Sequence, residues 1–158
     1  MSIEDFKGLM DGFDPATLLP NLDAVLGKLV LVARIAVLIG PVAMLIMGLV
    51  YLFLSPKEAN YYLGYRCYYG MGSVEAWQFT QRLAGIVWSA LGLVMSIVML
   101  VISGQFAELE TMKLLWRTVY CAAAEGILVL AAWIGVNAAV ASRFDSRGDL
   151  RKKNPKRK

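Results

Sequence analysis

The chain has 158 residues, of which 58% are hydrophobic, and its 16 lysine and arginine residues outnumber 12 acidic ones for a net charge of +4. Soluble domains have a smaller apolar share, so this composition predicts an integral membrane protein. The length suits a single domain. Three membrane spans with short connections would occupy nearly all of it, which excludes a separate soluble catalytic domain.

The residue types most used in catalysis and metal binding are scarce. Histidine is absent, and the two cysteines, Cys67 and Cys121, lie far apart in the sequence. Histidine is the commonest general base and metal ligand, and zinc sites or disulfide frameworks need several cysteines. We therefore predict that the chain is not an enzyme, holds no metal and uses no cofactor. Both cysteines are interpreted as small buried hydrophobes.

Residues 1–28 form the first predicted unit, an amphipathic segment on the extracytoplasmic side. The segment begins with acidic residues, so it lacks the basic start of a cleavable signal peptide. Ser2 precedes Asp5 by three positions, as in a helix capping box, and apolar residues follow at helical spacing. This pattern predicts an interfacial helix, and breaks at Pro15 and Pro20 lead into the first span.

Three spans are predicted at about residues 29–54, 83–103 and 118–141, where apolar residues run almost without charge. About 20 such residues cross a hydrocarbon core of ~30 Å as an α-helix. Pro41 predicts a kink in the first span. Small residues recur every three or four positions, so helices can approach closely, either within one bundle or between two copies in a homodimer. The predicted fold is all-α, a membrane bundle of three transmembrane helices preceded by the amphipathic helix.

The basic tail at residues 142–158 predicts the orientation. It holds eight lysine and arginine residues against two aspartates, and the positive-inside rule places such a segment in the cytoplasm. Three spans then place the N-terminus outside and the loop at residues 55–82 in the cytoplasm. Beside a membrane span, a basic tail sets orientation and contacts anionic lipid, so we expect no direct binding of nucleic acid.

Arg34, Glu125 and Asn137 are polar residues inside the predicted spans. An unpartnered carboxylate within a membrane is costly. Counted from the outer ends of the apolar runs at 1.5 Å per residue, Arg34 and Glu125 come to similar depth, so we predict that they pair. A structural role in fixing helix register is favoured, and a proton relay or a ligand site is the alternative.

The loop between the first two spans holds the densest cluster of unusual residues. Asn60 to Arg66 reads Asn-Tyr-Tyr-Leu-Gly-Tyr-Arg, and further notable residues follow at Ser73, Glu75, Trp77, Gln81, Arg82 and Gly85. Aromatic and arginine side chains at this level are expected as an interfacial belt, which accounts for part of the cluster. Simple anchoring does not account for the close spacing of Gly64, Tyr65 and Arg66.

In order and spacing, this pattern resembles the signature of the SdpI family, bacterial membrane proteins that give immunity to peptide toxins. The family pattern is an asparagine, then Gly-Tyr-Arg-Thr, then a serine and Glu-x-Trp entering a helix that continues with Asn-Arg and a glycine. Cys67 stands in place of the threonine, and Gln81 stands in place of the asparagine before arginine. We extend the resemblance over all three predicted spans, residues 29–141.

The resemblance implies a multi-pass protein of the bacterial plasma membrane that protects its cell from a membrane-active peptide or senses it. In some members it also implies signalling, by holding a transcriptional repressor at the membrane. We expect Arg66 to be the charged recognition group, with Asn60, Glu75 and Trp77 fixing the loop and Gly64 permitting a tight turn. The implied partners are membrane lipids, a toxin peptide and a cytoplasmic repressor.

A small transporter or an accessory subunit of a membrane complex is the alternative function. Arg34, Glu125 and Asn137 would then line a polar path between the helices. This alternative predicts that replacing Glu125 by glutamine abolishes transport or assembly while substitutions of Arg66 are nearly silent. Immunity predicts the opposite pattern.

Overall fold

The computed structural model describes residues 22–59 and 62–151, with side chains from residue 25 onward. Most of these residues belong to three long α-helices: α3 over Leu22–Phe53, α4 over Val74–Gly104 and α5 over Thr111–Arg143. Two short 3₁₀ helices flank α4, η1 at Tyr69–Met71 and η2 at Gln105–Glu108.

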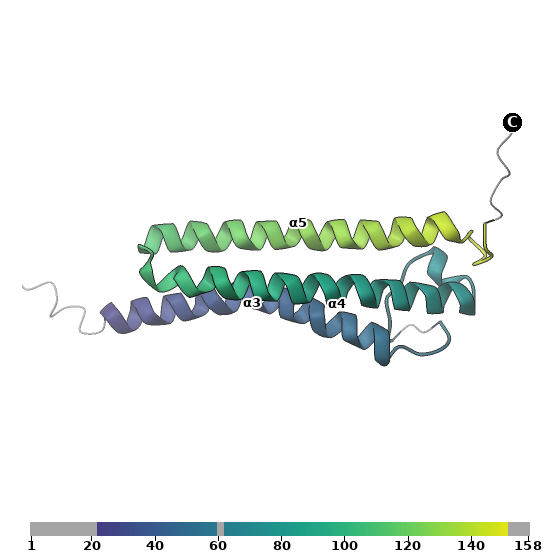
Figure 1. Ribbon diagram of the computed structural model, residues 1–158, viewed down its shortest axis with the longest axis horizontal. Helices are drawn as coiled ribbons and strands as arrows, with labels where there is room; N and C mark the ends of the chain where they lie inside the picture. Colours follow the sequence, from purple (N-terminus) through teal and green to yellow (C-terminus); the bar gives the residue numbers. More distant parts are fainter. Residues whose placement is uncertain (1–21, 60–61, 152–158) are drawn as a thin grey trace, which may run out of the picture.

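The three long helices run alongside one another (Figure 1), and each is long and apolar enough to cross a membrane. The helices that contain these candidate membrane spans are Val25–Phe53, Val74–Glu108 and Thr111–Arg143. The predicted all-α bundle of three transmembrane helices is confirmed. The amphipathic helix predicted near the N-terminus lies before residue 22, outside the described residues.

The second and third helices begin earlier than the apolar runs predict. α4 begins at Val74 rather than at residue 83, because the Ser73 hydroxyl caps the helix and accepts a hydrogen bond from Ala76 N–H at 3.1 Å. α5 likewise begins before residue 118, at Thr111. Hydropathy marks the part of a helix that lies in hydrocarbon, whereas the helix itself extends into the polar interface. The last part of the predicted loop 55–82 is therefore helical.

Glycines bring α3 and α4 into backbone contact. A Cβ atom added to Gly92 of α4 would lie 2.9 Å from the carbonyl oxygen of Pro41 on α3. A Cβ atom added to Gly48 would lie 2.7 Å from the Cα atom of Ser89. Small residues of this kind allow two membrane helices to gain close van der Waals contact. The ribbon of α3 bends along its length (Figure 1), and Pro41 in its interior is a sufficient cause.

The buried core extends along the bundle in three clusters of side chains. One lies near the connection between α4 and α5 and includes Val37 and Phe106. A second, in the middle, joins Met44, Met95 and Ala132, one from each long helix. Many large apolar side chains on the outer faces are exposed, as expected where lipid tails, which are as apolar as these side chains, are the solvent.

The third cluster lies where α3 ends and α4 begins, and it contains Tyr65 and Cys67 of the motif loop. We call this region the motif end. It comprises the last turn of α3, the described part of residues 54–73, the first turns of α4, the last turns of α5 and residues 144–151.

Candidate functional site

Gly64 occupies a position in the loop that only glycine fits. Its φ angle is +117°, in the region that L side chains rarely adopt. An added Cβ atom would lie 2.7 Å from the Trp77 ring and 3.0 Å from Oε1 of Gln81. The loop backbone therefore lies directly on α4, and the missing side chain makes this contact possible.

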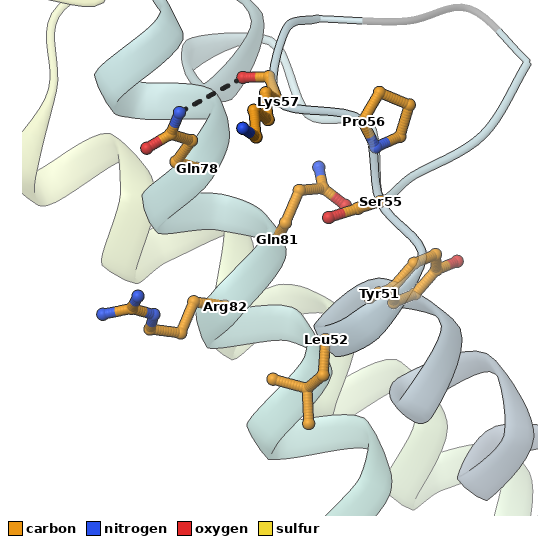
Figure 2. Close-up of a pocket in the computed structure, with 8 residues that line it drawn as sticks. All are labelled: Tyr51, Leu52, Ser55, Pro56, Lys57, Gln78, Gln81 and Arg82. Atoms are coloured by element: carbon orange, nitrogen blue, oxygen red, sulfur yellow. Dashed lines mark hydrogen bonds between the residues drawn. The ribbon is translucent and has the colours of Figure 1, made fainter.

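Two side chains of α4 hold the start of the loop. Trp77 is fully buried, and its Nε1–H donates to the carbonyl oxygen of Pro56 at 2.8 Å. Gln78, one residue later, donates from Nε2 to the carbonyl oxygen of Lys57 at 3.3 Å (Figure 2). The chain that leaves α3 is thus anchored on the second long helix before it reaches the motif.

Gln81 pairs with the backbone of Tyr65 through both ends of its amide. Its Oε1 accepts from Tyr65 N–H at 2.7 Å, and its Nε2 donates to the Tyr65 carbonyl oxygen at 2.7 Å. The side chain is only 3% exposed, so both bonds lie in a site with little water, where unpaired groups are costly. This glutamine, which stands where the SdpI pattern has asparagine, fixes the centre of the motif.

The side chain of Tyr65 connects the loop to α3 and α5. Its ring meets Tyr51 and Trp88 edge to face, with centroid separations of 5.8 and 6.0 Å. Its hydroxyl accepts from Nδ2 of Asn137 at 2.9 Å and donates to the carbonyl oxygen of Trp133 at 3.4 Å. Burial raises the pKa of Tyr65 to about 12, partly opposed by the Asn137 hydrogen bond, so the hydroxyl stays protonated at physiological pH. Asn137, predicted as an intramembrane polar residue, thus belongs to the motif end.

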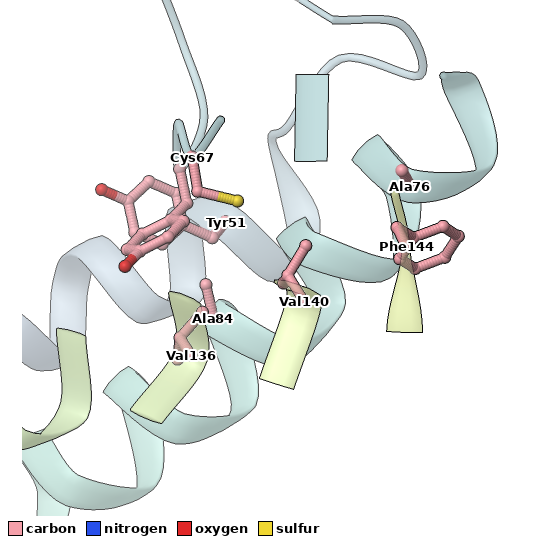
Figure 3. Close-up of a cluster of buried hydrophobic side chains, with 8 residues drawn as sticks. Tyr51, Cys67, Ala76, Ala84, Val136, Val140 and Phe144 are labelled. Carbon is pink, nitrogen blue, oxygen red and sulfur yellow. The ribbon is translucent and has the colours of Figure 1, made fainter. Parts of the chain in front are cut away.

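The core of the motif end draws on every long helix and the loop (Figure 3). Cys67 lies in it, and a Cβ atom added to Gly70 would lie 2.8 Å from the Cys67 sulfur. Burial raises the pKa of the Cys67 thiol, so it behaves as a small apolar group. The buried members are Tyr51, Tyr65, Cys67, Ala76, Ala84, Val136, Val140 and Phe144.

The first part of the basic tail folds into a turn that packs on the motif end. The Ser73 hydroxyl, which caps α4, also donates to the carbonyl oxygen of Gly148 at 2.7 Å, and Gly148 has a φ angle of +80°. Asp145 Oδ1 accepts from the N–H groups of Arg147 and Asp149, each at 2.9 Å. Hydrogen bonds from these two backbone N–H groups lower the pKa of Asp145, which therefore stays ionised inside the turn.

Several charged motif residues lie on the surface of the motif end. Arg66 is exposed between buried Tyr65 and buried Cys67. Glu75 and Arg82 are exposed on α4. Glu75 and Arg82 line a pocket of about 220 Å³, together with Gln78, Phe79, Arg143 and Phe144. Asn60, which is also part of the motif, falls outside the described residues.

The model of the SdpI/YfhL protein family matches residues 56–139, which is more than half of the chain. The chain belongs to the SdpI/YfhL family. No curated protein and no solved structure matches it. The SdpI/YfhL match covers the loop, α4 and nearly all of α5 but begins after α3, whereas the motif-based resemblance was extended over the first span as well.

Arg34 and Glu125 do not form the predicted pair in this SdpI-family protein. Arg34 donates from Nε to the carbonyl oxygen of Ser103 at 3.0 Å and from a terminal nitrogen to that of Gly104 at 3.4 Å. Glu125, 7% exposed, lies against Gly40, where an added Cβ atom would be 2.9 Å from Oε2. Its Oε1 has no hydrogen-bond partner among the described residues.

The reason is helix register. Gly40 lies six residues beyond Arg34 on α3, which corresponds to about 9 Å along the axis. Arg34 instead meets the carbonyl oxygens of Ser103 and Gly104 at the C-terminal end of α4, a usual position for a cation.

Sequence reasoning overlooked several residues that the motif end uses. Tyr51 and Trp88 surround the Tyr65 ring, and nothing in their local sequence separates them from ordinary interfacial aromatics. Gly148 was also overlooked, although Asp-Ser-Arg-Gly-Asp at residues 145–149 is a turn-forming sequence. Gly85, a predicted motif residue, packs against the Leu52 side chain of α3. A Cβ atom added to Gly85 would lie 2.8 Å from Leu52 Cδ2.

Proposed function

We propose that this SdpI-family protein gives immunity to a membrane-active peptide toxin or senses it, with Gly64, Tyr65 and Arg66 as the recognition or signalling element. The observation that supports this most is the double hydrogen bond between Gln81 and the Tyr65 backbone. It places the exposed Arg66 next to a rigid residue, and a preorganised guanidinium loses less entropy on binding.

The same contacts provide a path for a signal. Tyr65 contacts α3 through Tyr51, α4 through Gln81 and α5 through Asn137. A peptide that displaced the loop or shifted one helix would change all of these contacts together. In our proposal the motif end faces the cytoplasm, as the basic tail indicates, and a cytoplasmic repressor is the partner that reads the change.

The experiment that tests this is survival of a toxin-sensitive bacterium that expresses the chain. The toxin is one encoded beside the gene, and the variants are Arg66→Ala and, as a matched control, Arg117→Ala, an exposed arginine at the start of α5. We expect protection by the wild type and by Arg117→Ala, and loss of protection with Arg66→Ala at equal membrane levels. Absence of protection by the wild type would count against immunity, and equal survival of both variants would count against Arg66.

A small transporter or accessory subunit is the second candidate function, and the buried, incompletely paired Glu125 favours it. Because Arg34 bonds elsewhere, this candidate now depends on Glu125 alone. Loss of transport or of complex assembly in Glu125→Gln, with Arg66→Ala unaffected, would support it over immunity.

A further inference from the structure

A second pocket at the motif end is lined by two positively charged side chains that take part in none of the hydrogen bonds described for the motif. It has a volume of about 290 Å³ and lies between the last turn of α3, the start of the loop and α4 (Figure 2). Lys57 lines it from the loop, and Arg82 lines it from α4, one helical turn after Gln78. No aspartate or glutamate is among the residues that line it.

Among the described residues, no carboxylate lies within ion-pair distance of Lys57 or Arg82. The one ion pair among the described residues joins Lys113 to Glu110, close to the connection between α4 and α5. Glu75 shares the neighbouring pocket with Arg82 and Arg143 but does not line this one. Lys57 and Arg82 carry the same charge and line one pocket, so an anion bound there would be attracted to both.

Several acceptor groups around the pocket are already occupied. The carbonyl oxygens of Pro56 and Lys57 accept from Trp77 and Gln78, and both ends of the Gln81 amide pair with Tyr65. The charged donors of Lys57 and Arg82 remain for a ligand. A pocket lined by two cationic side chains and no carboxylate favours an anion, and arginine with lysine is the usual combination for phosphate.

The depth of the pocket fits a phospholipid head group. Leu52 and Tyr51, in the last turn of α3, form part of its wall, and the apolar span of α3 ends at Phe53. The pocket therefore lies where a bilayer changes from acyl chain to phosphate. Its volume of about 290 Å³ is just below the roughly 300–1,000 Å³ typical of ligand sites, which suits a head group better than a folded peptide.

We propose that this pocket binds a phosphate group, held by Arg82 and Lys57. The group can come from an anionic phospholipid, with an acyl chain passing Leu52, or from a free phosphate. The proposed phosphate site does not depend on toxin immunity, so a negative survival assay would not contradict it.

The test is native mass spectrometry of the full-length protein in detergent, with phosphatidylglycerol, phosphatidylcholine or inorganic phosphate added. We expect the wild type to retain phosphatidylglycerol more tightly than phosphatidylcholine. Lys57→Gln and Arg82→Gln should each weaken this binding about tenfold, as loss of a charge-assisted hydrogen bond implies. The matched control, Arg117→Gln, removes the same charge at the other end of the bundle and should bind like the wild type.

Arg82→Lys keeps the positive charge but loses the planar guanidinium group. Its affinity for phosphatidylglycerol should therefore lie between those of the wild type and Arg82→Gln, which would show that the loss in Arg82→Gln is not caused by unfolding. If inorganic phosphate binds with the same dependence on Lys57 and Arg82 while phosphatidylglycerol has no advantage, the ligand is a soluble phosphate. If Lys57→Gln and Arg82→Gln retain both ligands as well as Arg117→Gln does, the proposal is wrong.

Discussion

Gln81 and Tyr65 are joined by two hydrogen bonds of 2.7 Å, one in each direction, between a helix side chain and a loop backbone. This arrangement resembles a pair of strand residues more than an ordinary side-chain contact. It fixes the centre of the motif loop, whereas Trp77 and Gln78 of the same helix hold the start of the loop.

Removing the Gln81 amide should release the loop. Gln81→Leu leaves the buried N–H and C=O groups of Tyr65 without partners, and each such group costs about 1–3 kcal/mol. We expect the free energy of unfolding to fall by about 2–4 kcal/mol, together with faster proteolysis of the loop. Thermal unfolding in detergent and limited proteolysis measure the two effects.

Gln78→Leu is the control for Gln81, because Gln78 is exposed and makes one longer bond of 3.3 Å. It should change both measurements much less. Equal effects of the two substitutions would contradict the importance of the Gln81 pair.

Gly64→Ala should strain the loop against Trp77. The alanine would have to keep a φ angle of +117° and place its Cβ atom 2.7 Å from the indole ring. A loss of about 1–3 kcal/mol in stability is expected from the backbone strain alone, together with a shift in tryptophan emission. Gly126→Ala, which meets nothing within 4 Å, should leave both unchanged, and a similar loss there would contradict the argument.

The buried Cys67 thiol should make protein stability depend on alkaline pH and should react slowly with thiol reagents at neutral pH. Because burial raises the pKa of its thiol from the ordinary value of 9.0, the folded state favours the protonated form. This contribution to stability is complete below the ordinary pKa and is lost as pH rises through the higher folded pKa. Maleimide labelling of Cys67 in a Cys121→Ala background should therefore be slow at neutral pH.

The stability of the protein should fall more steeply between about pH 8 and pH 10 with Cys67 than with threonine at this position. Melting curves of the wild type and Cys67→Thr across this range test the difference. Parallel curves would show that the thiol is not linked to folding.

Glu125 should be energetically coupled to Gly40 and not to Arg34. Gly40→Leu pushes a side chain into the space of the Glu125 carboxyl group, so Glu125→Ala should partly restore stability, with a coupling energy of about 1 kcal/mol. Arg34→Ala and Glu125→Ala should be additive within about 0.5 kcal/mol. Double-mutant cycles of thermal stability measure both quantities. Rescue by exchanging the charges of Arg34 and Glu125 would contradict the observed register.

The proposed orientation predicts which positions are reachable from outside the cell. In a background without native cysteines, Ser146→Cys in the tail turn should be protected in intact cells from a thiol reagent that cannot cross membranes. Glu108→Cys, exposed in η2 at the other end of the bundle, should be labelled. The reverse pattern would place the motif end outside and remove the cytoplasmic repressor from the proposed function.

The sequence alone was sufficient for the features that depend on local composition. Transfer of about 20 apolar residues into lipid is favourable whatever their neighbours are, so the three spans could be predicted. The order and spacing of Gly64, Tyr65, Arg66, Trp77 and Arg82 were sufficient to suggest the SdpI family, which the family match confirmed.

Tertiary structure decided which polar groups meet. Counting residues from the end of an apolar run gives the depth of a side chain. It does not give the rotation of the helix or its register against a neighbouring helix, so the predicted pairing of Arg34 with Glu125 is wrong. Asn137 meets Tyr65 across 72 residues of sequence, and Ser73 meets Gly148 across 75. Such contacts arise only when three helices are packed together, and they make the motif loop part of the bundle.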